Sequence, residues 1–121
     1  MKEIASIIRK AKKDKSVLAV ILYGSVARKQ PARDVDICIV LHPQSKSSIF
    51  KRLQYTPTSE KYDVHIFQSL PLYVQQRILA EGKVLYCRNR SALYDLAFQI
   101  IREFDLFEPH YRSYLMKVAH G

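Results

Sequence analysis

Residues 22–36 read LYGSVARKQPARDVD and place two acids, Asp34 and Asp36, at the start of a β-branched run, 34–41. Such a run predicts a strand. Because side chains alternate faces along a strand, the two acids point the same way and lie roughly 6 to 7 Å apart. Mg2+ prefers carboxylate ligands of this kind and completes its shell with substrate phosphates. We therefore expect a metal site here, although an Asp-X-Asp pair also occurs simply as the solvated start of a strand.

The turn before these acids has the composition of a phosphate site. Residues 17–23 form a continuous apolar run, which predicts a strand covered on both faces. Gly24 permits a tight turn and a close approach of the backbone to a ligand. Ser25 would then begin a short helix, whose free N–H groups favour a phosphate, or would serve only as an N-cap. Arg28 lies one helical turn further on, where its charge would neutralise a departing pyrophosphate.

A third acid fits the same arrangement. Residues 62–67 alternate like a strand and place Asp63 and His65 on one face. If this strand lies beside that of Asp34 and Asp36, three carboxylates gather, and such clusters hold two metal ions in phosphoryl displacement. Asp63 is equally consistent with a solvated strand end, and His65 with an ordinary core or surface histidine.

The remaining pattern alternates between helices and strands in a single domain, residues 1–121. Apolar residues at helical spacing, together with Pro71 before and Gly82 after one segment, indicate the helices. We expect a long last helix, which Pro109 kinks or interrupts. The predicted fold is α/β (α+β), a small mixed sheet with helices packed mainly on one face. The expected segments are a helix at 2–14, strands at 17–23 and 34–41, a helix at 47–54, a strand at 62–67, a helix at 71–82, a short strand at 83–87 and a helix from about residue 93.

Composition narrows the class of protein. The formal net charge is +9 and the isoelectric point is about 9.7, and residues 1–15 carry six Lys or Arg against two acids. No apolar run is long enough to span a bilayer, and the N-terminus lacks a signal-peptide core. Two distant cysteines, Cys38 and Cys87, lack metal-ligand spacing, and we expect free thiols in a cytoplasmic protein.

The order Gly-Ser, Asp-X-Asp, Asp resembles the polymerase-β-like nucleotidyltransferase superfamily, and in particular its minimal nucleotidyltransferases (MNT). The phrase EGKVLY at 81–86 is similar to one that follows the core sheet in that group. The resemblance implies a nucleotidyltransferase fold that uses Mg2+ and a nucleoside triphosphate. Carried over by residue, it implies nucleotide binding at Gly24 and Ser25, metal binding at Asp34 and Asp36, and metal binding or deprotonation at Asp63.

The same resemblance implies an acceptor outside the chain. We expect the chain to be too short to include the acceptor-binding domain of larger superfamily members. Minimal nucleotidyltransferases are often encoded beside a helical HEPN-type protein. Some act as antitoxins by attaching AMP from ATP to a tyrosine of that partner. The expected function is therefore Mg-dependent transfer of AMP to a hydroxyl of a partner protein or another acceptor. Aromatic residues of the last helix offer surface for a homo- or hetero-oligomer, unless they pack on the sheet: Phe98, Phe104, Phe107, Tyr111 and Tyr114.

One departure from the family pattern keeps two other functions open. Eight residues, 26–33, separate Ser25 from Asp34, whereas the family interval is nearer ten. A shortened loop is consistent with a nucleotide-binding subunit that has no catalytic activity. The basic composition suggests a nucleic-acid-binding module instead, but the aromatic residues are not interleaved with basic ones as stacking platforms usually are.

Overall fold

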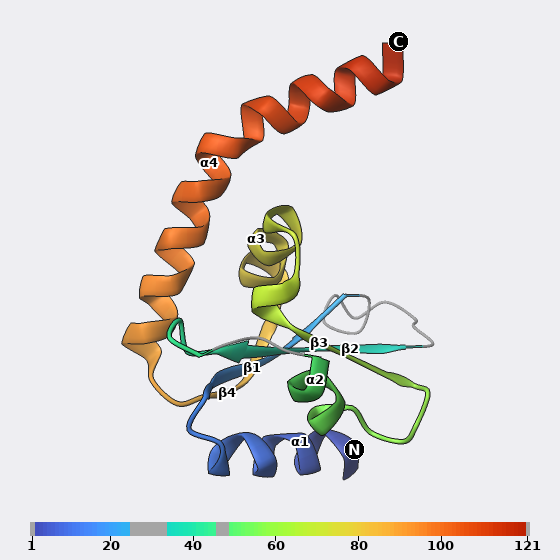
Figure 1. Cartoon of the computed structure of the whole chain (residues 1–121), viewed down its shortest axis with the longest axis vertical. Coiled ribbons are helices and arrows are strands. Elements are labelled where there is room, and N and C mark those ends of the chain that lie inside the picture. Colours follow the sequence, from blue (N-terminus) through green and yellow to red (C-terminus); the bar gives the residue numbers. More distant parts are fainter. Residues whose placement is uncertain (1, 25–33, 46–48, 121) are drawn as a thin grey trace.

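The computed structural model describes residues 2–24, 34–45 and 49–120. Its order of elements follows the predicted alternation closely, with boundaries that differ by up to three residues (Figure 1). The second helix was expected from residue 47, and residues 47 and 48 lie outside the described part of the chain. The elements are α1 (Lys2–Lys13), β1 (Val17–Tyr23), β2 (Val35–Leu41), α2 (Ile49–Tyr55), β3 (Tyr62–Ile66), the 3-10 turn η1 (Phe67–Ser69), α3 (Leu72–Glu81), β4 (Lys83–Cys87) and α4 (Arg90–His120).

The four strands form one mixed sheet in the order β3-β2-β1-β4. Strand β1 is antiparallel to both of its neighbours, whereas β2 and β3 run parallel and are connected through α2. The first six residues of β1 are buried, as its continuous apolar run predicted. The expected mixed α+β fold is confirmed. The parallel pairing of β2 with β3 sets which residues of these two strands lie side by side.

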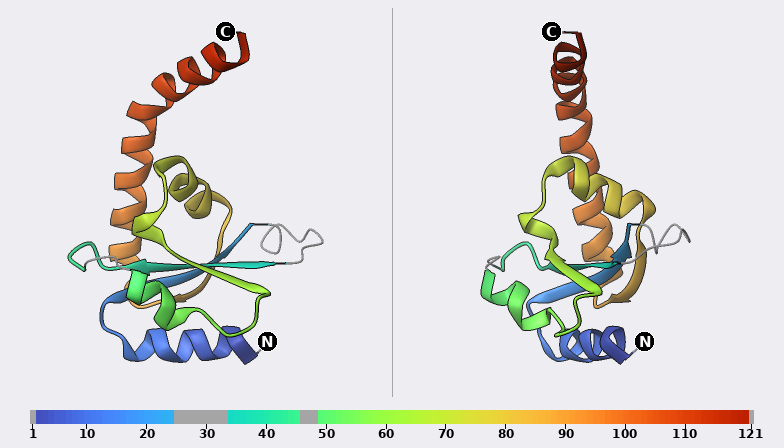
Figure 2. Two further views of the ribbon diagram at one scale, coloured as in Figure 1. Left: turned by 45° about the vertical axis from the view of Figure 1, so that its right-hand side comes forward. Right: turned by 90° about the vertical axis from the view of Figure 1, so that its right-hand side faces the viewer.

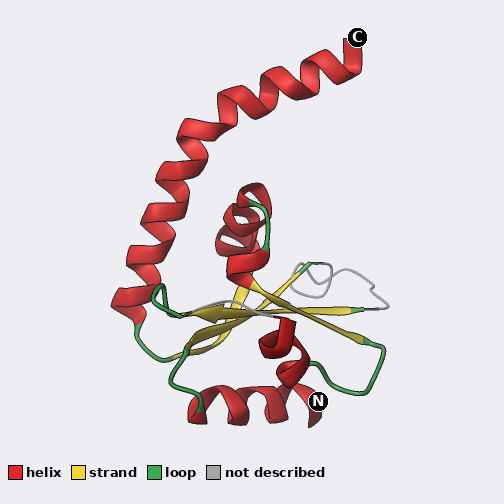
Figure 3. Cartoon of the chain, in the orientation of Figure 1, coloured by secondary structure: helices red, strands yellow, loops and turns green. Residues whose placement is uncertain are grey.

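Helices cover both faces of this sheet, whereas we had expected them to pack mainly on one face. Helices α1 and α2 pack on one face through residues such as Ile7 and Tyr55. Helices α3 and α4 pack on the other through Ile78, Leu93 and Leu96. Figures 2 and 3 show the strands between these two layers. The reason is that β1 and β2 are apolar on both sides, so both sides require cover.

Hydrogen bonds of two side chains, Asp14 and Arg88, hold α1 against α2 and against the sheet. Asp14 accepts hydrogen bonds from Lys51 at 2.6 Å and from the Tyr55 hydroxyl at 2.8 Å, joining the end of α1 to α2. Burial alone would raise the pKa of Asp14, but these hydrogen bonds and those from Ser16 outweigh it and hold the pKa far below its usual range. Arg88, just after β4, donates to the carbonyls of Ala11, Lys12, Asp14 and Val17, at the end of α1, in the turn that follows it and at the start of β1. Carbonyls at the end of α1 thus gain donors from a residue that follows β4.

Helix α4 runs through Pro109 without interruption, so of the two effects predicted for this proline, a kink or a break, the break does not occur. The Ser113 hydroxyl donates to the Pro109 carbonyl at 3.0 Å, and the helix curves away from the sheet over its later part (Figure 1). Proline and such serine contacts are known causes of helix bending. No described helix has the combination of length and hydrophobicity that a bilayer crossing requires.

Candidate active site

Two of the three predicted acids meet at the edge of the sheet. Asp36 on β2 and Asp63 on β3 are direct register partners across the parallel pair. Their neighbours in the strands, Val35 and Tyr62, belong to the core below the sheet, so both acids lie on the α3 side. Parallel pairing brings their carboxylates together, as the three-acid hypothesis required for this pair.

Gly24 lies directly against one of these carboxylates. Its φ angle is +77°, a conformation that residues with a side chain rarely adopt. A Cβ atom at this position would come within 2.4 Å of Asp36 Oδ2. Only glycine therefore allows the turn to close over Asp36, which explains why the predicted phosphate turn carries glycine here.

Asp34 is placed differently from Asp36. Strand β2 begins at Val35, so Asp34 lies one residue before it and is exposed. Burial raises the pKa of Asp36, and the charges of Asp63 and, more weakly, Asp34 raise it further, while His65 lowers it. Three carboxylates thus repel one another across this edge of the sheet.

Asp63 is held by a histidine and an arginine. His65 Nε2 lies 3.0 Å from Asp63 Oδ2, and a guanidinium nitrogen of Arg52 lies 3.5 Å from Oδ1. Arg52 also donates from Nε to the carbonyl of Val64 at 2.7 Å, on the free edge of β3. The position of Asp63 is therefore set by α2 and by its own strand together.

The remaining predicted nucleotide contacts, Ser25 and Arg28, lie outside the described residues. Gly24 marks the point where the described chain enters that turn. The assignment of phosphate binding to Ser25 and Arg28 stays a prediction.

The donor chemistry at this edge suits a hard divalent cation. Carboxylate oxygens are the ligands that Mg2+ prefers. Burial first, and then repulsion from Asp63, raise the pKa of Asp36, and a cation would relieve that repulsion. Within ranges 2–24, 34–45 and 49–120, no three Asp, Glu, His or Cys side chains already form a metal cage. Mg2+ usually takes only one or two carboxylates and fills its shell with phosphates and water, so the residues present fit a substrate-dependent site.

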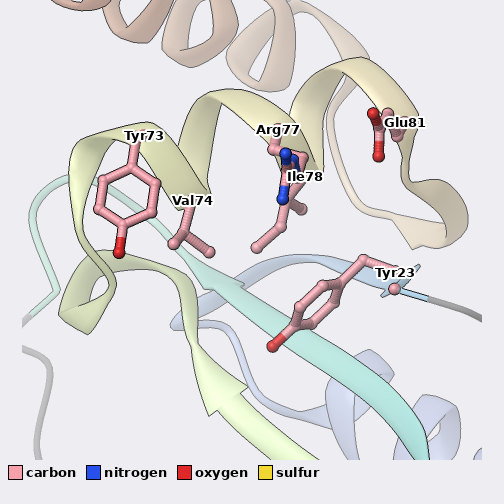
Figure 4. Close-up of a pocket in the computed structure, with 7 residues that line it drawn as sticks. Tyr23, Tyr73, Val74, Arg77, Ile78 and Glu81 are labelled. Atoms are coloured by element: carbon pink, nitrogen blue, oxygen red, sulfur yellow. The ribbon is translucent and has the colours of Figure 1, made fainter. Parts of the chain in front are cut away.

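Sequence reasoning missed several residues near these acids. Arg52 was assigned no role, and its contact depends on β3 being an edge strand, which sequence does not reveal. Tyr23 lies opposite Asp36 in the antiparallel register. Tyr23 and Gly24 also line a cavity of about 180 Å³ under α3, with Tyr73, Val74, Arg77, Ile78 and Glu81 (Figure 4). Spacing of four residues between Tyr73, Arg77 and Glu81 was the available signal that these three share one helix face.

Comparisons with known proteins match this chain to one family. Residues 5–91 match the family model described as polymerase beta, nucleotidyltransferase. A protein of Methanocaldococcus jannaschii, named as a candidate protein adenylyltransferase, is 34% identical over 73 residues; the match covers 58% of this chain and 56% of that protein.

Solved structures share the fold at low sequence identity. A chain from a toxin–antitoxin with AMP-PNP superposes with a TM-score of 0.77 at 15% identity, covering 98% of this chain and 97% of the other. A chain from a tri-AMPylated Shewanella oneidensis HEPN toxin in complex with MNT antitoxin gives a TM-score of 0.75 at 15% identity, covering 98% and 94%.

Proposed function

The chain belongs to the polymerase β nucleotidyltransferase family, and we propose on that basis that it transfers AMP from ATP to a hydroxyl group of a partner protein. The M. jannaschii relative supports adenylyl transfer to protein, and the AMP-PNP complex supports a triphosphate substrate. Since the match spans only 56% of that relative, the acceptor is assigned here as a proposal.

The observation that carries the proposal is the pairing of Asp36 with Asp63 beneath Gly24. Two half-buried carboxylates lie in register here, and a glycine turn closes over one of them. The turn positions a phosphate beside the acids, and the acids supply the ligands and the base that phosphoryl transfer uses.

In the proposed reaction, the acceptor oxygen forms a bond to the α-phosphorus of ATP and the bond from that phosphorus to the β-phosphate oxygen breaks. Pyrophosphate leaves with the bonding electron pair. A Mg2+ ion bound by Asp34 and Asp36 would neutralise phosphate charge when present. Asp63, which contacts His65 and Arg52, receives the proton of the attacking hydroxyl in this proposal. Gly24 keeps the turn close to Asp36, which sets where the phosphates lie.

We assign the acceptor-binding surface to α4. On this helix Tyr94, Phe98 and Ile101 recur at i, i+4 and i+7 and are 57%, 67% and 46% exposed, while Leu93 and Leu96 face the core. An apolar stripe left exposed on a helix is typical of a contact with another protein. The neighbouring complexes of MNT with HEPN proteins support a helical HEPN-type partner, and the pair would act as a toxin–antitoxin system.

We place this protein in the cytoplasm, where ATP is available and the free thiols of Cys38 and Cys87 stay reduced.

The test combines the purified protein, Mg2+ and ATP labelled on the α-phosphate with its co-purified partner. Label should pass to the partner and be lost in Asp36→Asn. The matched control is Glu60→Gln, an exposed acid in the loop before β3, which should transfer normally. Transfer of γ-label instead would indicate a kinase and contradict the proposal. Binding of Mg-ATP without any transfer would indicate a nucleotide-binding subunit that has no activity.

The partner surface is tested separately. Phe98→Asp should abolish co-purification and transfer to the partner while leaving ATP binding intact. Phe50→Asp, on α2 and 78% exposed, is the control and should leave the complex intact. Equal loss in both variants, or in neither, would remove α4 from the proposal.

A further inference from the structure

A small cavity lies between α3 and the end of β1, beside the proposed phosphate turn. Figure 4 shows Tyr73, Val74 and Arg77 on α3 above the sheet, with the ring of Tyr23 below them. Its volume is about 180 Å³. The cavity plays no part in the chemistry assigned above to Asp34, Asp36 and Asp63.

The cavity adjoins the turn at Gly24 that is proposed to hold the phosphates of the nucleotide. Gly24 belongs both to the cavity wall and to the contact with Asp36. Tyr23, on the cavity floor, is the register partner of Asp36. A molecule whose phosphates lie at Gly24 therefore has the cavity as the adjoining space under α3.

The cavity is too small for a whole nucleotide but large enough for one part of it. Pockets that enclose a whole drug-sized ligand have volumes of about 300–1,000 Å³. A space of about 180 Å³ is below that range and suits a single planar ring system, with the sugar and phosphates outside.

The lining offers what a heterocyclic base requires. Tyr23 and Tyr73 supply aromatic rings, Val74 and Ile78 supply apolar surface, and Arg77 supplies a cation. Every nucleobase has a π-face that stacks on aromatic side chains and guanidinium groups. Burial, Cys38 and the nearby carboxylates raise the pKa of Tyr23 above its ordinary value, so its hydroxyl stays protonated as a donor.

We propose that this cavity holds the base of the nucleoside triphosphate, with Tyr73 and Arg77 as the residues that determine affinity for it. This inference depends on the proposed function, because it assumes that the triphosphate lies at the Gly24 turn. The other candidate occupant is an aromatic side chain of the acceptor protein. The base is favoured because the cavity adjoins the phosphate turn, whereas the apolar stripe proposed for the partner is on α4.

The experiment measures binding of Mg-ATP and of Mg-tripolyphosphate, which has no base, by calorimetry on the full chain. Tyr73→Leu should weaken ATP binding by about 5- to 100-fold, the range expected when base stacking is lost. Binding of tripolyphosphate should be unchanged. Tyr73→Phe keeps the ring and should retain ATP affinity, and Arg77→Gln should weaken ATP but not tripolyphosphate. Arg90→Gln, an exposed arginine at the start of α4, is the control.

Kinetics then separate the possible outcomes. In the transfer assay Tyr73→Leu should raise KM for ATP and change the ratio of kcat/KM between ATP and CTP. If Tyr73→Leu raises KM for the acceptor alone, the cavity belongs to the acceptor and the inference is wrong. Equal losses for ATP and tripolyphosphate, or no loss for either, would also overturn it. If the unmodified protein binds no Mg-ATP and transfers no label, the proposed function itself fails; if it is active but indifferent to Tyr73, only this inference fails.

Discussion

Replacing Gly24 by alanine tests how the turn and the acid beneath it depend on each other. The φ angle of +77° costs a residue with a side chain about 1–2 kcal/mol, offset in part by the lower chain entropy that alanine brings to the unfolded state. The new Cβ would also stand 2.4 Å from Asp36 Oδ2, so the carboxylate must turn away. Forcing a side chain off its rotamer costs about 0.5–1.5 kcal/mol. We expect Gly24→Ala to lower the free energy of unfolding by about 1–3 kcal/mol in total.

The two contributions are separable by a double-mutant cycle. In an Asp36→Ala background the oxygen that causes the clash is gone, whereas the backbone strain remains. Gly24→Ala should therefore cost about 0.5–1.5 kcal/mol less in that background, measured by urea unfolding of all four proteins. A coupling energy of zero would mean that Gly24 and the Asp36 carboxylate do not touch in solution.

Activity should fall further than stability. A displacement of about 1 Å at a reacting group can cost about 100-fold in rate. We expect Gly24→Ala to reduce label transfer by about that factor at a temperature where the variant is still folded. Unchanged transfer would refute the idea that the glycine turn fixes Asp36 for the reaction.

Three further predictions concern single residues. Asp36→Asn should abolish transfer and raise the stability of the protein at neutral pH. Because the folded pKa of this acid is raised, its ionised form destabilises the fold. The difference in stability between the two proteins, followed by thermal unfolding, should therefore vanish as pH falls through that pKa to below about 3.8. Asp14→Asn should lower the free energy of unfolding, measured in urea, by about 1–3 kcal/mol because Lys51 loses a part-buried acceptor. Since the folded pKa of Asp14 is lowered, the unmodified protein should lose this advantage as pH falls below about 3.8. A constant difference between the two proteins down to pH 2 would contradict the assignment. Pro109→Ala restores an N–H donor within α4 and should increase amide protection in the residues after 109, measured by hydrogen exchange, with unchanged protection contradicting the bend as a site of weakness.

The local elements could be predicted from the pattern of apolar residues along the chain. The apolar run 17–23 and the β-branched run 34–41 became β1 and β2 almost to the residue, since each needed burial on both faces. The same reasoning should have predicted helices on both faces. It failed because helical periodicity shows that a helix has an apolar side but not which face of the sheet receives it.

The site was predictable in part for a similar reason. Alternation placed Asp34 and Asp36 on one strand, but the strand begins at Val35 and leaves Asp34 exposed. The register between Asp36 and Asp63 results from the parallel connection through α2, which no local pattern encodes. The cavity under α3 depends on tertiary packing between segments some fifty residues apart, so its lining could not be read from spacing. Phosphate binding by Ser25 and Arg28 remains a prediction.

The contact of Arg88 with the end of α1 bears on how the chain matures during translation. A nascent polypeptide emerges N-terminus first, so α1 and the central strand β1 are synthesised well before Arg88 and the edge strand β4 that flanks β1. Until then the carbonyls at the end of α1 lack the donors that Arg88 supplies, and one side of β1 is open to foreign strands. Completion of the N-terminal layer therefore waits for the C-terminal third of the chain, and ribosome stalling before residue 88 would leave an aggregation-prone intermediate.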